Sequence, residues 1–453
     1  MSQPFHPHDY QLRAIKLLLT QGSGGLLLDP GLGKTAVCLA AYKVLKTKGL
    51  VPRGMLVIAP LRPCYQVWPK EIEKWLEFND LTYAVCHGND KAEMLALDVD
   101  IHIINPEGLA WLFNLKNPGR KDWTILCVDE STKFKNSTTK RFKLMRHQFP
   151  KFDRRWILTG TPMPQGLEDL FGQTFILDLG RALGRYITHY RVKYFYSNAW
   201  EPYKWFPKDG SFKEIIERID PLMLRLASED YLDMPPVIQE AIYVDLPEEA
   251  REKYKDIEDD FITQLETGTV IAANAAVAGG KCRQICNGAL YINREHDWVT
   301  IHDEKIGALE ELIESLGGAP MLVMYEFNHD KERLLGRLGS AIPVLGGGTS
   351  AGKSNQYISE FNEGKHPVML CHPASMAHGL NLQEACHHIC WFGITWNLEH
   401  YDQSIARIYR QGQEFPVFVY HILVTDSLDD RVVEVLKQKD HNQKALFKTL
   451  STR

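Results

Sequence analysis

The first half of the chain alternates short, continuous apolar runs with longer segments of helical period. The apolar runs include GGLLLDPG, MLVIAP, IHIINP, TILCVDE and RRWILTGTP, and helical segments such as TAVCLAAYKVLK and QVWPKEIEKWL lie between them. A continuous apolar run is typical of a strand buried on both faces, and helices between such strands form the crossovers of a parallel sheet. The same alternation returns near the end in APMLVMYEF, PVMLCHP, HHICWFG and VFVYHILV. The pattern predicts an α/β chain with two parallel-sheet lobes.

The stretch between the two alternating regions has a different character. From about residue 180 to residue 300, helical, aromatic and charged segments dominate, and Met-Pro-Pro at 234–236 marks a break. We therefore predict a first lobe over residues 1–180, a helical insertion and linker over 181–300, and a second lobe over 301–453.

Composition narrows the class of protein. The 453 residues are 44% hydrophobic and 24% charged, enough apolar material to fill more than one core. No uncharged apolar run approaches the roughly 18 residues of a membrane span, and MSQPFHPHDYQ lacks the features of a signal peptide. Nine cysteines scattered through apolar runs are typical of reduced thiols. We expect a protein of the cytosol or nucleus without a membrane partner.

The net charge of the chain implies that any surface that binds a polyanion must be a local cluster of basic residues. The 52 Lys and Arg against 57 Asp and Glu give a net charge of -5, so no global field attracts nucleic acid. Between Lys133 and Arg155, however, nine basic residues accompany a single acid, Asp153. A solvated helix face and a phosphate-binding surface both fit this composition.

Two glycine-rich segments compete for the role of phosphate loop. The strict pattern G-x-x-x-x-G-K-[ST] occurs at 347–354 with Lys353, whereas the segment with Lys34 has Leu28 where the first glycine belongs. A nucleotide site also needs a carboxylate for Mg²⁺ on a neighbouring strand. Only the first lobe provides one, in the Asp129-Glu130 pair after ILCV. The context favours Lys34, and Lys353 is expected to follow an ordinary glycine-rich turn.

The residue types around Lys34 fit phosphate chemistry. Glycines allow the backbone to approach phosphates, Lys34 offsets the charge of the β- and γ-phosphates, and the Thr35 hydroxyl is a ligand for Mg²⁺. Asp129 completes the metal site, and Glu130 is the candidate to orient and deprotonate the attacking water. The predicted nucleotide-binding segment is Asp29, Pro30, Gly31, Leu32, Gly33, Lys34 and Thr35.

At this point the chain resembles superfamily 2 helicases, and within them the Swi/Snf-type ATP-dependent DNA translocases. The resemblance rests on DPGLGKT, VIAPLRPCYQVWPKEIEKW, VDESTKFKN and LTGTPMPQGLEDLF in the first lobe. In the second lobe it rests on the GGTS block, PASMAHGLNLQEA and QSIARIYRQGQ with the tail PVFVYHILVTDSLDDRV. These motifs extend from residue 9 to about residue 435 in the family's order. The compact form is similar to bacterial or phage members, which indicates a cytoplasmic location.

The resemblance implies two RecA-like lobes with ATP in the cleft between them and helical insertions that bind double-stranded DNA. It implies that Gln11 recognises adenine, and that Gln403, Arg407 and Arg410 face the ATP. Their i, i+4, i+7 spacing predicts one face of a helix. The implied DNA contacts are Arg62, Lys133, Lys135, Lys140, Ser375 and Asn381. A monomer that uses ATP and Mg²⁺ is expected.

Two features depart from the family pattern or stay open. Thr132 stands where the family usually has a histidine that couples hydrolysis to motif III, although its hydroxyl can still form a hydrogen bond. Residues 186–206 contain nine aromatic side chains. These aromatics fit either the small core of the inserted helices or a platform that stacks on bases.

Three functions remain at this stage. The first is a DNA-stimulated ATPase that translocates on double-stranded DNA and remodels protein–DNA complexes or forks without extensive strand separation. The second is a strand-separating helicase acting on DNA or RNA, which needs a wedge hairpin. The third is a nucleotide-dependent switch or scaffold, which the presence of Lys34, Asp129, Glu130, Arg407 and Arg410 disfavours.

Overall fold

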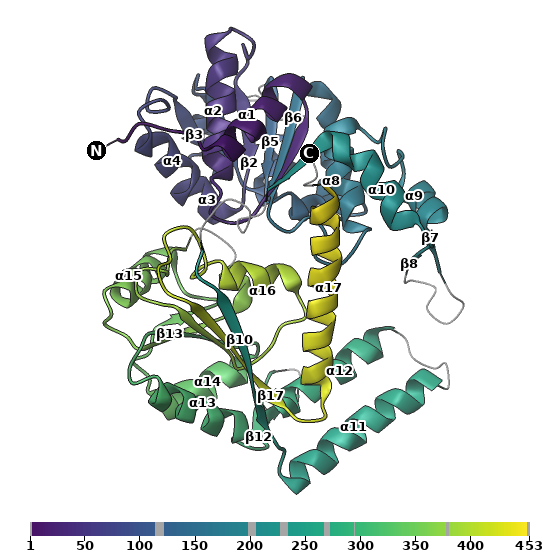
Figure 1. The fold of residues 1–453 in the computed structure, drawn as a ribbon, viewed down its shortest axis with the longest axis vertical. Coiled ribbons are helices and arrows are strands. Elements are labelled where there is room, and N and C mark those ends of the chain that lie inside the picture. The colour runs from purple at the N-terminus through teal and green to yellow at the C-terminus, as the bar shows by residue number, and fades with distance from the viewer. Residues whose placement is uncertain are drawn as a thin grey trace. The chain divides into compact units, whose positions relative to one another are not determined.

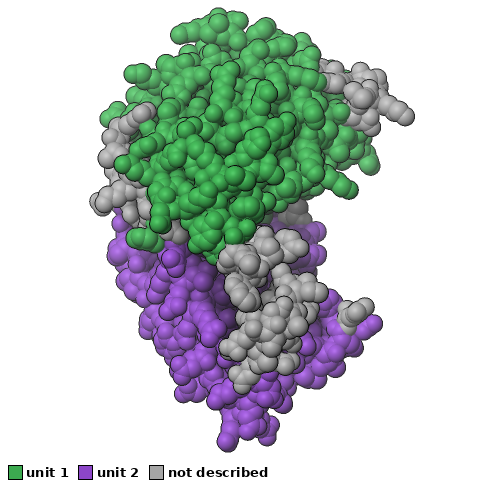
Figure 2. All heavy atoms as spheres, turned by 90° about the vertical axis from the view of Figure 1, so that its right-hand side faces the viewer, with its two compact units in different colours: residues 1–233, 441–453 green, residues 234–440 purple. Residues whose placement is uncertain are grey.

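The computed structural model describes residues 2–113, 122–197, 205–226, 234–266, 272–293, 295–376 and 380–450. The chain divides into two units (Figure 2): unit 1 comprises residues 1–233 and 441–453, and unit 2 comprises residues 234–440. Each unit contains a parallel sheet of its own, covered by helices (Figure 1).

The sheet of unit 1 is parallel throughout the described residues, in the order β3-β4-β2-β5-β6-β1-β9. Core clusters cover both faces of this sheet, since successive residues such as Leu26 and Leu27 point to opposite faces and belong to different clusters. This explains the continuous apolar runs. The strands are β1 (Gly24–Leu28), β2 (Met55–Ile58), β3 (Tyr83–Val85), β4 (Ile101–Ile104), β5 (Ile125–Asp129), β6 (Arg154–Thr159) and β9 (Met223–Leu226).

Helices connect the strands of unit 1 as crossovers, and a two-stranded hairpin of β7 (Phe195–Tyr196) and β8 (Phe206–Pro207) lies between the last two of these helices. The helices are α1 (Asp9–Gln21), α2 (Lys34–Thr47), α3 (Leu61–Gln66), α4 (Trp68–Lys74), α5 (Lys91–Ala96), α6 (Leu109–Leu112), α7 (Lys140–Arg146), α8 (Asp169–Asp178), α9 (Ile187–Tyr194) and α10 (Ser211–Ile219).

The sheet of unit 2 is also parallel in the part of the chain described, in the order β10-β17-β16-β13-β15-β14. Its strands are β10 (Val237–Val244), β13 (Met321–Met324), β14 (Val344–Leu345), β15 (Val368–Cys371), β16 (His388–Trp391) and β17 (Val417–Val424). A separate hairpin pairs β11 (Ala289–Tyr291) with β12 (Trp298–Thr300). The predicted fold class, an α/β chain with two parallel-sheet lobes, is confirmed.

The helices that begin in unit 2 are α11 (Glu248–Glu266), α12 (Ala272–Cys286), α13 (Glu304–Ser315), α14 (Asn328–Leu338), α15 (Ala351–Asn362), α16 (Leu398–Ile405) and α17 (Leu428–Leu450). Within the described ranges, no helix combines the length and the apolar composition that a membrane crossing requires.

The stretch predicted to lack strands contributes an edge strand to each sheet. β9 pairs with β1 in unit 1, and β10 pairs with β17 in unit 2. Along the chain, the boundary between the two units therefore lies near residue 233, within the predicted insertion at 181–300. Both strands lack a clear apolar run, since Arg225 interrupts β9 and most residues of β10 are exposed or half-buried, as edge positions allow.

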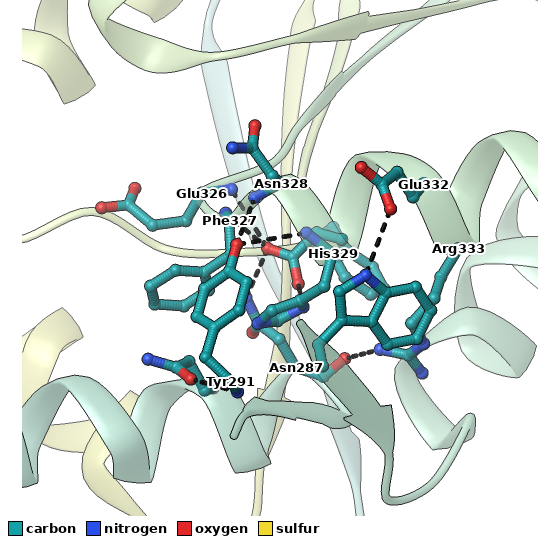
Figure 3. A network of polar contacts seen from close by, with 12 residues as sticks. Asn287, Tyr291, Glu326, Phe327, Asn328, His329, Glu332 and Arg333 are labelled. Carbon is teal, nitrogen blue, oxygen red and sulfur yellow. Dashed lines mark hydrogen bonds and ion pairs between the residues drawn. The ribbon is translucent and has the colours of Figure 1, made fainter. Parts of the chain in front are cut away.

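A buried polar network ties the end of α12 to unit 2 (Figure 3). The Asn287 amide donates to Asp330 (2.9 Å), and the same carboxylate oxygen accepts the backbone N–H of Phe327 (2.9 Å). Arg333 donates to the Asn287 carbonyl (2.6 Å). Lys305, also buried, donates to the Asn287 side chain (3.1 Å) and pairs with Asp429 (2.6 Å). Because buried charges are costly unless they are paired, this network holds the end of α12 and the neighbouring helices α13, α14 and α17 in place relative to one another.

Candidate functional site

The predicted phosphate loop joins the carboxyl end of β1 to the N-terminus of α2. Gly31 and Gly33 have φ angles of 92° and 75°, which residues with a side chain rarely adopt. A Cβ atom on Gly33 would also lie 2.6 Å from the Gln11 amide nitrogen. Both positions therefore require glycine. The loop places the N-terminus of α2, with the N–H groups of its first turn, at the carboxyl end of β1.

Lys34 lies among acidic groups from two motifs. Its ammonium donates to the carbonyls of Leu28 (2.8 Å) and Asp29 (3.4 Å). Burial lowers the pKa of Lys34, and the charges of Glu130, Asp129 and Asp29 raise it. The structure thus brings together the predicted lysine and the predicted carboxylates in unit 1.

Asp129 is held by a partner that the sequence did not reveal. Asp129 ends β5, and one carboxylate oxygen accepts the indole N–H of the fully buried Trp68 (3.0 Å). The other oxygen accepts the backbone N–H of Glu130 (3.1 Å). Burial raises the pKa of Asp129, whereas the Trp68 hydrogen bond and the Lys34 charge lower it. Trp68 therefore fixes the orientation of the predicted metal ligand.

Glu130 has an unusual backbone conformation. Its φ of 52° and ψ of 61° place it in the left-handed region, directly after the strand. A side-chain-bearing residue in this region stores strain, which concentrates at functional sites. The strained position belongs to the carboxylate that the sequence predicts to act on the attacking water.

The Ser131 side chain of motif II is linked to motif III through Gln173. The Ser131 hydroxyl donates to the Gln173 side-chain carbonyl (2.7 Å). The Gln173 amide in turn donates to the backbone carbonyls of Pro162 and Asp169 (2.9 Å for Asp169). Gln173 lies on α8, outside the quoted motif III, so the sequence pattern offered no signal for it.

Gln11 contacts the phosphate loop from the first turn of α1. Its amide nitrogen donates to the Leu32 carbonyl (3.2 Å), and its amide oxygen accepts the His8 backbone N–H (3.0 Å). The side chain is buried. The residue predicted to recognise adenine therefore lies directly beside the predicted nucleotide loop.

The competing glycine segment lies in a different setting. Lys353 is exposed on the first turn of α15, after the short edge strand β14. Added Cβ atoms at Gly347, Gly348 and Gly352 would meet nothing within 4 Å. The Lys353 backbone N–H is capped by the Ser350 hydroxyl (3.4 Å). These features are typical of a glycine-rich turn before an ordinary surface helix.

The expectation of one helix face for Gln403, Arg407 and Arg410 is wrong. α16 ends at Ile405, and the two arginines lie in the turns after it. The backbone changes there to tighter bonds, such as Arg407 N–H to the Ser404 carbonyl (3.2 Å). The arginines still converge, because both donate to the Leu380 carbonyl (3.4 Å each). Arg407 and Gln403 are buried, and Arg410 is half-buried.

The basic stretch after motif II does not form one surface. Arg154 and Arg155, at the start of β6, donate hydrogen bonds to backbone carbonyls of other segments. Lys135 pairs with Asp169 (3.4 Å), and Arg141 pairs with Glu107 (2.9 Å). The exposed members are Lys133, Lys140, Lys143 and Lys151. The exposed basic side chains of this stretch are therefore lysines on or near α7.

The other predicted DNA contacts are spread over both units. Arg62 lies half-buried on α3 and donates to Gln66 (3.1 Å), and burial lowers its pKa. Ser375 ends a 3₁₀ turn after β15, and the Asn381 carbonyl accepts a bond from Asn362 (2.9 Å). Residues 377–379 between them lie outside the described part of the chain.

The aromatic stretch divides into two groups. Tyr190, Tyr194 and Phe195 are buried and belong to the core of unit 1. Tyr196 is 52% exposed and packs against Phe206 across the β7–β8 hairpin, with ring centroids 5.7 Å apart. Trp200 and Tyr203 lie outside the described residues. Trp205 is partly buried against the same core as the first group, so the core interpretation holds for these four residues.

The residues present fit a magnesium site that the nucleotide completes. Thr35 and Asp129 offer a hydroxyl and a carboxylate oxygen, which are ligands that Mg²⁺ prefers. Among the described residues, no group of three or more His, Cys, Asp or Glu side chains could hold a metal ion by itself. A site with few protein ligands is typical of Mg²⁺ bound together with phosphates and water.

Comparisons with known proteins agree with this geometry. The family model described as SNF2-related domain matches residues 10–290, and the model described as helicase conserved C-terminal domain matches residues 304–412. Putative protein p41 of Acyrthosiphon pisum secondary endosymbiont phage 1 is 33% identical over 98% of this chain and 99% of its own length. A putative ATP-dependent helicase/translocase of Bacillus subtilis is 24% identical over 95% of this chain, which spans 47% of that protein.

Among solved structures, the Sulfolobus solfataricus SWI2/SNF2 ATPase core in complex with double-stranded DNA is similar at 22% identity. The match covers 100% of this chain and 97% of that one with a TM-score of 0.45.

The fold and the site define the class as the ATPases of helicase superfamily 2. Within that class, the chain belongs to the SNF2-related family. The predicted family, the pair of RecA-like lobes and the enzyme class, a DNA-stimulated ATPase, are confirmed.

The first prediction concerns the two lysines that competed for the phosphate role. Lys34→Ala is expected to abolish ATP hydrolysis, because it removes the cation that offsets phosphate charge. Lys353→Ala is expected to leave the rate within about threefold of the wild type. Steady-state phosphate release at saturating DNA measures both rates. Equal losses in the two variants would contradict the choice of loop.

Proposed function

We propose that the protein is an ATP-dependent motor that translocates on double-stranded DNA and remodels protein–DNA complexes or forks without extensive strand separation. The convergence of Lys34, Asp129 and Glu130 in unit 1 carries the proposal. A scaffold has no need of a strained carboxylate beside an intact phosphate loop. The similarity to a phage protein over 98% of this chain supports the cytoplasm of a bacterial cell as the place where the proposed motor works.

In the proposed reaction, the first turn of α2 and Lys34 bind the β- and γ-phosphates, and Gln11 recognises the adenine. Thr35 and Asp129 hold Mg²⁺, which when bound would neutralise phosphate charge. Glu130 accepts the proton of the attacking water. Trp68 keeps the Asp129 carboxylate in place, so the metal ligand does not reorganise during turnover.

Arg407, Arg410 and Gln403 of unit 2 are the proposed partners of the transferring phosphoryl group. A guanidinium that engages only in the closed state of the motor stabilises the transition state more than the ground state. Arg410 is the better candidate for direct contact, since it is half-buried, whereas Arg407 is buried and bonded to two backbone carbonyls.

The proposed DNA surface is electrostatic. In this proposal the exposed lysines near α7, together with Arg62, Ser375 and Asn381, contact phosphates. Lys135, although predicted as a contact, must first exchange its ion pair with Asp169. Binding through phosphates tracks a duplex of any sequence, as a translocating motor requires.

One observation favours a strand-separating helicase as the second candidate. The β7–β8 hairpin carries Tyr196, which is 52% exposed and packs against the half-buried Phe206, and an exposed aromatic ring is suited to stack on a base at a fork. This candidate predicts strongest stimulation by single-stranded or forked nucleic acid.

The second prediction tests the duplex as the stimulating partner. ATP turnover measured side by side should rise most with duplex DNA and less with single-stranded DNA or RNA. If the protein neutralises six phosphates, the logarithm of the DNA-binding constant should fall against the logarithm of the salt concentration with a slope of about -5, whatever the DNA sequence. Stronger stimulation by single strands would favour the helicase candidate.

The third prediction concerns the lysines near α7. Changing Lys133, Lys140 and Lys143 to Gln should reduce the magnitude of the slope of log binding constant against log salt by about 3. Each lost phosphate contact is expected to reduce that slope by about 1. The matched control changes Lys16, Lys48 and Lys70, which are exposed elsewhere on unit 1. Equal slopes for the two triple variants would show that the α7 lysines do not contact DNA.

The fourth prediction concerns Arg410. Arg410→Ala should lower kcat by about 10³-fold, with a much smaller change in ATP affinity, because the arginine acts in the transition state. Arg337, exposed on α14 and paired with Glu310 (2.7 Å), provides the control variant Arg337→Ala. Near wild-type turnover by Arg410→Ala with saturating duplex would rule out this role.

A further inference from the structure

A buried arginine lies on the edge strand next to the phosphate loop. β9 pairs in parallel with β1, and Arg225 is the register partner of Leu27, two residues before Asp29. The Arg225 side chain is 4% exposed. Arginine is rarely buried unless it is paired, so its partners indicate why it is there.

Two partners of Arg225 lie at the end of β1 and at the start of the loop. One guanidinium nitrogen donates to the Leu27 carbonyl (2.9 Å), and another forms an ion pair with the Asp29 carboxylate. The next residue of β9 joins the same contact, because the Asp29 backbone N–H donates to the Leu226 carbonyl (3.3 Å). The side chain and backbone of Asp29 are therefore both fixed by β9.

Asp29 is an acidic residue in a site for an anion. Its carboxylate raises the pKa of Lys34, as the carboxylates of Asp129 and Glu130 do, whereas the Arg225 charge lowers it. Without Arg225, Lys34 would face three carboxylates alone. Phosphates would then meet repulsion from Asp29 that no neighbouring guanidinium offsets.

We propose that Arg225 is a positioning residue of the nucleotide site, which neutralises Asp29 and holds the start of the phosphate loop in its phosphate-binding conformation. Arg225 does not touch the nucleotide in this account. It sets nucleotide affinity through Asp29. The proposal rests on the assignment of the loop around Lys34 as the ATP site.

A purely structural arginine would have a different signature. If Arg225 only joined β9 to β1 through the Leu27 carbonyl, its loss would lower stability whether or not Asp29 carried a charge. If Arg225 acts by neutralising Asp29, removing both charges should restore affinity. The double variant therefore separates the two roles.

The experiment measures the equilibrium binding of a fluorescent ADP analogue and the melting temperature of the full chain without DNA. Its variants are Arg225→Met, Asp29→Asn and the double variant Arg225→Met/Asp29→Asn. Arg225→Met should weaken binding by about tenfold or more, because an uncompensated carboxylate faces the phosphates. The double variant should bind at least about fivefold more tightly than Arg225→Met.

Two further variants control for folding. Arg155→Met removes an arginine of β6 that donates to the backbone carbonyls of Phe152 and Leu177, and it should change affinity less than about twofold. Arg225→Lys keeps the charge and should bind more tightly than Arg225→Met, even if both melt at lower temperature.

Equal affinity in Arg225→Met and the double variant, or unchanged affinity in Arg225→Met, would overturn the proposal. If Arg225→Met does not fold, the comparison of Arg225→Lys with the double variant decides in the same way. Failure of the loop assignment gives another result, since Lys34→Ala would then bind the analogue as tightly as the wild type.

Discussion

The charge balance around Lys34 is the constraint on which the rest of unit 1 depends. One ammonium group interacts with Asp29, Asp129 and Glu130, which come from the ends of two strands that are not neighbours in the sheet. Each carboxylate has its own restraint, since Asp29 pairs with Arg225, Asp129 accepts a hydrogen bond from Trp68, and Glu130 itself adopts a left-handed backbone conformation. The parallel sheet supplies the common edge at which these groups meet, and the glycines of the loop allow phosphates to approach it.

Unit 2 uses buried polar contacts for a different purpose. Its network around Asn287 joins the end of α12 to α14 (Figure 3). Lys305 extends the network to α13, and its ion pair with Asp429 extends it to α17. Removing one partner from such a network would leave a buried charge unpaired, so the end of α12 is held firmly to its neighbours in unit 2. The segment with Arg407 and Arg410 is likewise anchored, through the Leu380 carbonyl.

The sequence predicted the sheets well because their strands are buried on both faces and form continuous apolar runs. It failed for β9 and β10, since an edge strand can carry Arg225 or a mostly exposed pattern and still pair with its neighbour. The phosphate loop was predicted because its chemistry is local in sequence. Trp68, Gln173 and Arg225 were missed because they reach the site through tertiary contacts that no spacing encodes, and the turn after Ile405 ended a helix that spacing alone extended.

The central claim is that hydrolysis drives movement along an intact duplex. The most direct measurement is the ATP-dependent displacement of a triplex-forming strand from a duplex, run beside the unwinding of a forked duplex of equal length. The account predicts that the triplex strand is displaced at a rate that depends on ATP and is lost in Lys34→Ala, while the forked duplex stays paired. Unwinding of the fork without displacement of the triplex strand would contradict it.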